Sequence, residues 1–460
     1  MKYAPKEQNL GITPYRNYQY SLDRSKKAGR LLILFLLWLL SFISFSPPGR
    51  EIPLSIASLD WVAVLKLSSR IIAFCVLCAL FVKYRSTDEK RYIFIQLRPF
   101  IILALWLVIS ITWSPFKDIT LGHSIEVLMS ISFSYLVALL FLKNRDQSTL
   151  CYNFFVISIL ICLGCLVAWH LLPSSKLQFG RGIFRPYFFM HPNAIALLAS
   201  IGLINLVVLR TLWRWRWTRI FLMPGVIIYC YTIIIAQSRT AIFATLAIFV
   251  ITVCLVIKRS LVFLGSIIIV FIVSIILLLG LHENIVDKTT NYLTRGQTKE
   301  EVISATGRMD IWNYAIKSFL QSPIIGHGYF IMSPIGLVDV WGTNTWKLTH
   351  SIFLHILTGV GIIGMILFLW AMLKILRIIQ SGLKRGGEKK RVAIWCSLIF
   401  GWFLLVGIYE ISFFGQINAV TMFFYITLGI AFGRLKNNKT SDMYFDKNAT
   451  LGIANNTNKM

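Results

Sequence analysis

Charged residues are scarce in this chain of 460 residues: 14% are Asp, Glu, Lys or Arg, whereas 57% are hydrophobic. A soluble domain of this length does not need so much apolar surface, so the composition excludes an ordinary soluble fold. The apolar residues fall into continuous blocks of about 20, the length that spans a bilayer core, and they do not alternate as in a β-barrel. We therefore expect an all-α, polytopic transmembrane helical bundle.

Signatures of metal and nucleotide binding are also missing. No carboxylate cluster of the D-x-D type and no Walker motif occur, which argues against a metal-held nucleotide sugar and against a P-loop enzyme. The eight cysteines lie in or beside apolar runs, and the C-x-x-C pairs Cys75/Cys78 and Cys162/Cys165 have no adjacent His or Lys. Such cysteines are typical packing residues. We expect no disulfide framework, no metal site and no cofactor.

Acidic residues are few, because 19 Asp and Glu stand against 46 Lys and Arg, for a formal net charge of +27. In a soluble protein this excess would suggest nucleic acid. In a membrane protein the cytoplasmic loops collect Lys and Arg, which explains the charge without a nucleic-acid partner. We therefore expect the lipid bilayer, and no nucleic acid, as a partner.

The apolar runs divide the chain into a basic cytoplasmic lead over 1–30, one transmembrane domain over 31–433, and a disordered cytoplasmic tail over 434–460. Twelve spans are predicted: 31–46, 60–82, 99–113, 122–142, 151–172, 194–210, 219–236, 240–257, 260–281, 351–373, 393–410 and 413–433.

The distribution of Lys and Arg predicts the orientation. With the N-terminus inside, the inner segments hold 31 of these residues and the outer segments hold 12. Since cytoplasmic loops carry the positive excess, both termini are predicted to be cytoplasmic. The long polar loop 282–349 then faces outward, and we expect it to carry short amphipathic helices.

Cations on the outer side run against this tendency, so each of them needs a reason. Segment 180–193 (G-R-G-I-F-R-P-Y-F-F-M-H-P-N) places Arg185 and His191 among aromatic residues in a predicted surface loop. It is either an interfacial aromatic belt with snorkelling arginines or part of a binding site. The H-P-N turn is also typical of a helix N-cap.

Two further outer arginines are predicted in first helical turns. Arg239 lies in Q-S-R-T between two spans, and Arg308 begins an amphipathic helix of about fifteen residues that can lie on the membrane surface. Free amides at a helix N-terminus together with a guanidinium suit a phosphate group. Alternatively, Arg239 is merely an interfacial residue. Asp310, two residues after Arg308, could simply stabilise the start of its helix.

His350 lies at the outer start of the tenth predicted span, beside the long polar loop. A neutral imidazole there can act as a general base near pH 7, although a histidine that merely ends a span is the alternative.

Two guanidinium groups hold a pyrophosphate well, because each forks onto phosphate oxygens. Arginines and a histidine on one side therefore favour displacement of a lipid-linked pyrophosphate.

At these residues the sequence resembles the O-antigen ligase/polymerase superfamily of bacterial envelopes (the Wzy-type C-terminal domain). The matching pieces follow the family order over about residues 180–365: G-I-F-R-P-Y-F-F-M-H-P-N, Q-S-R-T-A, T-G-R-M-D-I-W with S-P-I-I-G-H-G-Y, and T-H-S-I-F-L-H with G-V-G-I-I-G. The family often has His-Asn where this chain has His350-Ser351.

The resemblance implies a metal-independent inverting glycosyltransferase in the bacterial inner membrane, with its active site facing the periplasm. Arg239 and Arg308 would bind the pyrophosphate of an undecaprenyl-pyrophosphate-linked oligosaccharide, and His350 would be the catalytic base. Arg185 and His191 would have a supporting role on the donor side. The acceptor would be a glycan or lipid A-core, and a chain-length regulator is a candidate partner.

The acceptor is left open by the sequence. A polymerase that joins repeat units of O-antigen or exopolysaccharide is favoured over an O-antigen ligase by G-R-M-D-I-W, which looks slightly more like the polymerases. A flippase or other transporter would place charges along a path through the membrane. The charges in or at the edges of the spans are scattered, which argues against transport: Lys66, Arg70, Arg98, Glu126 and Glu410.

Overall fold

The computed structural model describes most of the predicted transmembrane domain. The predicted spans 31–46 and 260–281, both terminal segments and most of loop 282–349 lie outside the described residues. The described residues are 87–143, 147–172, 176–179, 183–187, 190–214, 218–256, 308–330, 349–411, 413–414 and 418–435, with isolated positions between 61 and 79.

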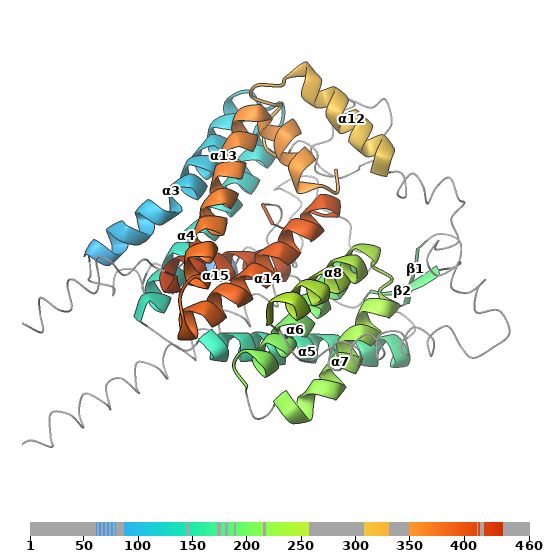
Figure 1. Cartoon of the computed structure of the whole chain (residues 1–460). Helices are drawn as coiled ribbons and strands as arrows, with labels where there is room; N and C mark the ends of the chain where they lie inside the picture. Colours follow the sequence, from blue (N-terminus) through green and yellow to red (C-terminus); the bar gives the residue numbers. More distant parts are fainter. Residues whose placement is uncertain are drawn as a thin grey trace, which may run out of the picture.

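The described residues form a helical bundle in which the apolar blocks have become helices (Figure 1). Seven of the helices, all except α8, α12 and α15, are long and apolar enough to cross a membrane, so a multi-pass helical membrane protein is confirmed. The helices are α3 (Thr87–Ile109), α4 (Lys117–Lys143), α5 (Gln147–Leu171), α6 (Pro192–Thr211), α7 (Thr218–Ile235), α8 (Arg239–Val256), α12 (Arg308–Gln321), α13 (Ile352–Leu383), α14 (Gly387–Tyr409) and α15 (Ala419–Arg434), with a 3-10 turn at Ser110–Thr112.

Two short strands depart from the expected loop over 180–193. Strands β1 (Lys176–Phe179) and β2 (Ile183–Pro186) pair in antiparallel register, with Leu177 opposite Arg185. The alternation of polar and apolar side chains in β1 suits a strand, and β2 leads the chain toward the start of α6. It thereby presents Arg185 to the helix ends beside it.

Close packing and buried polar pairs hold the bundle together. Helix α15 packs on α4, α6 packs between α5 and α7, and α13 contacts both α3 and α14. In the centre, the indole N–H of Trp395 donates to Asn205 at 2.9 Å and that of Trp402 donates to Ser200 at 2.7 Å. Such interhelical hydrogen bonds satisfy polar groups that have no access to water.

Helix α13 is interrupted at Gly361, whose φ of +67° and ψ of −166° are not helical. The loop after α12 fills the break: the amides of His327 and Gly328 donate to the carbonyls of Thr358 and Gly359 at 3.0 and 2.7 Å. In the other direction, the amides of Ile362 and Ile363 donate to Pro323 and Ile324 at 2.9 and 3.3 Å. The interrupted backbone is therefore satisfied by protein, as a membrane requires.

We predict that Gly361→Ala destabilises the protein. The backbone conformation is one that essentially only glycine adopts, and a Cβ atom would also collide with the backbone of Ile324. The expected loss is about 2 kcal/mol or more of the free energy of unfolding, measured by thermal unfolding in detergent micelles. Gly164→Ala is the control, because a Cβ atom there meets nothing within 4 Å. Equal melting temperatures for the two variants would contradict the prediction.

Candidate functional site

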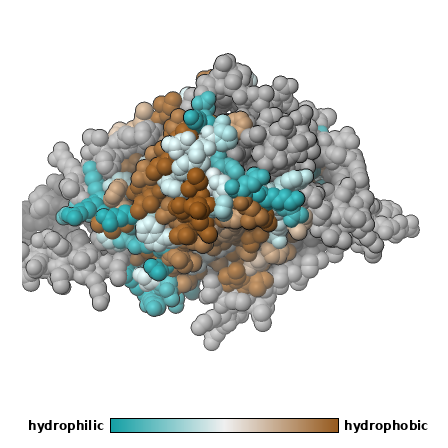
Figure 2. All heavy atoms as spheres, turned by 90° about the horizontal axis from the view of Figure 1, so that it is seen from above, coloured by the Kyte–Doolittle hydropathy of each residue, from teal (hydrophilic) through white to brown (hydrophobic). Residues whose placement is uncertain are grey.

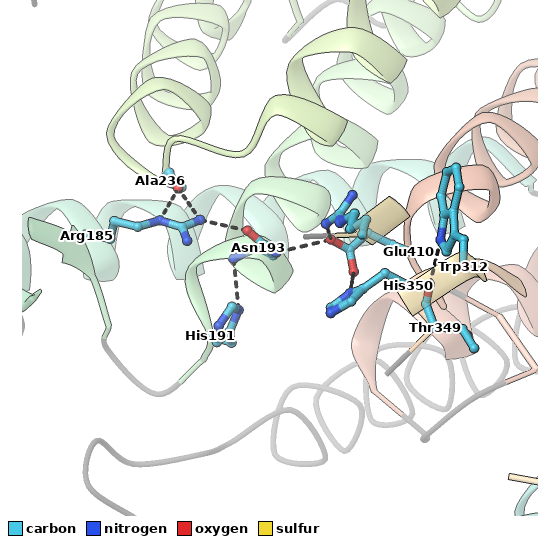
Figure 3. A network of polar contacts seen from close by, with 9 residues as sticks. Arg185, His191, Asn193, Ala236, Trp312, Thr349, His350 and Glu410 are labelled. Atoms are coloured by element: carbon cyan, nitrogen blue, oxygen red, sulfur yellow. Dashed lines mark hydrogen bonds and ion pairs between the residues drawn. The ribbon is translucent and has the colours of Figure 1, made fainter. Parts of the chain in front are cut away.

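The carboxylate of Glu410 lies at the end of the bundle where α12 crosses it, just after the last residue of α14. Three side chains from other parts of the chain bind it (Figure 3). Arg308, the first residue of α12, donates from Nη2 to Oε1 at 2.9 Å, and Asn193 donates from Nδ2 to the same oxygen at 3.2 Å. His350 contacts Oε2 through Nδ1 at 3.2 Å. One carboxylate thus joins the starts of α6, α12 and α13 to the end of α14.

Asn193 is held from its other side by Arg185 of strand β2. The guanidinium donates from Nη2 to Asn193 Oδ1 at 2.7 Å, and its Nε and Nη2 donate to the carbonyl of Ala236 at 2.8 and 2.6 Å. Arg185 is only 5% exposed. It therefore binds the residue that follows α7 and the first turn of α6 at once, and these hydrogen bonds offset the cost of burying a guanidinium.

His191 is the N-cap of α6, as the H-P-N turn indicated. Its Nδ1 accepts a hydrogen bond from the amide of Asn193 at 3.3 Å, and Pro192 occupies the first helical position. Although part of the ring is open to solvent, shielding from bulk water and then the positive charge of Arg185 lower the pKa of His191 to about 4. The ring is therefore neutral at physiological pH.

Arg239 is the first residue of α8, in the first helical turn that the sequence predicted. The chain reaches it through a tight turn in which Gln237 has a φ of +51° and Ser238 is buried. Arg239 lies within electrostatic range of Arg308. Two like charges thus lie near each other at the start of a helix whose free amides also favour an anion.

His350 has an unusual backbone conformation, with a φ of +49°. The residue before it is held firmly: the indole Nε1 of Trp312 donates to the carbonyl of Thr349 at 2.9 Å. The ring of Trp312 in turn stacks on Tyr409 with centroids 6.1 Å apart. A strained conformation that persists because its surroundings hold it in place is common at functional sites.

Opposing effects act on the Glu410 carboxylate. Burial alone raises its pKa, but the hydrogen bond and charge of His350, the charge of Arg308 and, at acidic pH, that of His191 outweigh burial, so the pKa of Glu410 lies below its usual value. The carboxylate is therefore ionised at neutral pH.

Seen from the α12 end, hydrophilic residues interrupt the apolar surface of the molecule (Figure 2).

The structure joins four of the five sequence-predicted site residues in one network, and it places the fifth, Arg239, within electrostatic range of Arg308. Arg308 and His350 meet through Glu410, while Arg185 and His191 join the same network through Asn193. Glu410 had been counted among scattered charges, and Asn193 and Trp312 were not singled out. An acidic residue at the end of an apolar run, on the same predicted side as the arginines, was the available signal for Glu410. Among the described residues, no group of three or more His, Cys, Asp and Glu could hold a metal ion.

We predict that Trp312→Phe loosens the His350 segment. Phenylalanine keeps a ring for Tyr409 but has no N–H for the carbonyl of Thr349, so about 1 kcal/mol of stability should be lost. Thermal unfolding in detergent measures this loss. The control is Trp370→Phe, since Trp370 is 41% exposed on α13. Equal effects of both substitutions would show that the indole hydrogen bond does not stabilise this segment.

Comparison with known proteins gives one match. The family model described as O-antigen ligase matches residues 224–369, which include Arg239, Arg308 and His350 but not the segment 180–193. No curated protein matches the chain. The matched range carries three of the four motif groups that pointed to this superfamily. Residues 224–369 therefore match the O-antigen ligase family model, in agreement with the resemblance to the O-antigen ligase/polymerase superfamily that the motifs indicate.

Proposed function

We propose that the protein is a glycosyltransferase that moves a glycan from undecaprenyl pyrophosphate to an acceptor hydroxyl at the periplasmic face of the inner membrane. The observation that carries this proposal is the network around Glu410, in which a histidine and an arginine bind opposite oxygens of one carboxylate. The first can accept a proton and the second can bind an anion. Both groups lie in the range that matches the family model.

His350 is proposed as the general base. Because an ionised carboxylate only accepts hydrogen bonds, its contact with Nδ1 places the proton on Nδ1 and leaves the lone pair of Nε2 free. Glu410 is then a positioning residue: it selects the tautomer and stabilises the imidazolium once His350 is protonated. His350 is about one-third exposed, so an acceptor can approach it.

Arg239 and Arg308 are proposed to bind the donor pyrophosphate, with Arg185 and His191 supporting this side of the site through Asn193. In the reaction, the acceptor oxygen attacks the anomeric carbon and its proton passes to Nε2 of His350. The bond from that carbon to the pyrophosphate oxygen breaks, and its electron pair leaves with undecaprenyl pyrophosphate. A single displacement of this kind inverts the anomeric centre. The two guanidinium groups supply the positive charge that stabilises the leaving group, without a metal ion.

Polymerisation of O-antigen or exopolysaccharide repeat units is the proposed reaction, and ligation to lipid A-core is the second candidate. G-R-M-D-I-W at 307–312 favours the polymerase, whereas the matching family model is described as a ligase. A flippase is less well supported, because Glu410, one of the charges that could have marked a path, belongs to the histidine–arginine network.

We predict that His350→Gln reduces glycan transfer about 100- to 10,000-fold, because the amide cannot accept the proton. The measurement is formation of extended or transferred glycan in cells that carry only the variant, with its membrane level checked by immunoblot. His170→Gln is the matched control: His170 lies in the last turn of α5, and its Nε2 contacts the hydroxyl of Tyr231 at 3.0 Å, outside the network. Normal transfer by His350→Gln at normal protein level would refute the assignment.

The glycans of a deletion strain should separate the two reactions. We expect single repeat units on lipid A-core and no long chains, which is the pattern of a missing polymerase. Long chains that remain on undecaprenyl pyrophosphate, with bare core, would instead identify a ligase. Repeat units confined to the cytoplasmic leaflet would refute both and indicate a flippase. The measurement is the glycan length in separate extracts of lipid A-core and of undecaprenyl-linked glycans.

A further inference from the structure

The carboxylate that positions His350 also binds the arginine that is proposed to hold the donor. Arg308 donates to Glu410 Oε1 at 2.9 Å, whereas His350 uses the other oxygen. A guanidinium binds a carboxylate and a phosphate with the same N–H groups and the same fork geometry. The Glu410 carboxylate therefore offers Arg308 the same kind of negatively charged oxygen acceptor as the phosphate that Arg308 is proposed to bind.

Glu410 is the fixed partner of this ion pair. Asn193 and His350 also hold its carboxylate, and Asn193 is anchored in turn by the buried Arg185. Arg308 is held less tightly, because among the described residues its guanidinium is hydrogen-bonded only to Glu410, and because α12 crosses the end of the bundle and packs mainly on α13. Its side chain is 19% exposed. When an anion arrives, Arg308 can turn toward it while Glu410 stays in place.

The charges around Arg308 indicate that Glu410 and a bound anion would compete for this arginine. Arg239 and Arg308 lie within electrostatic range of each other, and an anion between them relieves their repulsion. Glu410 already neutralises Arg308, so part of this relief is present before any ligand binds. A bound pyrophosphate must therefore displace the carboxylate or share Arg308 with it.

We propose that Glu410 is an internal competitor that weakens the hold of Arg308 on the pyrophosphate lipid and so promotes release of undecaprenyl pyrophosphate after transfer. This inference rests on the proposed function, because it assumes that Arg308 binds the pyrophosphate. It assigns opposite effects to one residue: Glu410 supports transfer through His350 and opposes tight binding through Arg308.

The test is the affinity for undecaprenyl pyrophosphate, measured by microscale thermophoresis on purified protein in nanodiscs. Glu410→Gln keeps the shape and one acceptor oxygen for Arg308 and Asn193 but removes the charge, and its NH2 group cannot accept from Nδ1 of His350. Since partly exposed ion pairs contribute up to about 1 kcal/mol, we expect this variant to bind about fivefold more tightly. Arg308→Gln should bind more weakly than the natural protein. In the double variant Glu410→Gln/Arg308→Gln, the fivefold gain should disappear, because the competition acts through Arg308.

Glu126→Gln is the matched control, because Glu126 pairs with His123 at 3.0 Å on α4, outside the network, and its loss should leave the affinity unchanged. Weaker or unchanged binding by Glu410→Gln, with Arg308→Gln still impaired, would overturn the competition alone. A gain that persists in the double variant would also overturn it, since Glu410 would then repel the anion directly. Unimpaired binding by Arg308→Gln would overturn the pyrophosphate assignment itself. Melting temperatures establish that each variant is folded.

Discussion

The carboxylate of Glu410 is the interaction on which the site depends. Arg308, Asn193 and His350 come from three separate helix starts, and each of them binds this group. An ionised carboxylate at the edge of an apolar bundle is costly unless charged partners surround it, and here they do. The same contacts that make its burial tolerable also bring the proposed base, His350, and the proposed anion-binding cation, Arg308, to one place. The stability of this end of the molecule and its proposed function therefore depend on one group.

The interrupted helix α13 also helps to hold the residues around Glu410 in place. Because the loop after α12 supplies hydrogen bonds to both sides of the break at Gly361, helix α12 and the first part of α13 are tied to each other. His327 adds a contact of 2.7 Å back to the carbonyl of Ser318 in α12. Arg308 at the start of α12 and His350 before α13 are thus linked through the backbone as well as through Glu410.

The apolar runs predicted the helices well, because length and hydrophobicity alone decide which segments can cross a bilayer. Arg239, Arg308 and His350 could be proposed as site residues from the sequence, since polar residues on the predicted outer side needed an explanation; these roles stay predictions. The sequence places Glu410 at the end of an apolar run on the same predicted side as the arginines, but it does not tell which residues lie opposite this charge. The same limit hid Asn193 and Trp312, whose roles depend on partners distant in sequence. The hairpin of β1 and β2 was missed because a short aromatic segment between spans is also typical of an interfacial loop.

The central claim is that the site binds a pyrophosphate beside a histidine base, and a structure of the protein with undecaprenyl pyrophosphate in nanodiscs tests it most directly. The account predicts density for the pyrophosphate between the guanidinium groups of Arg239 and Arg308, with Nε2 of His350 facing the position of the anomeric carbon. Pyrophosphate density elsewhere, with Arg308 and His350 still bound only to Glu410, would contradict it.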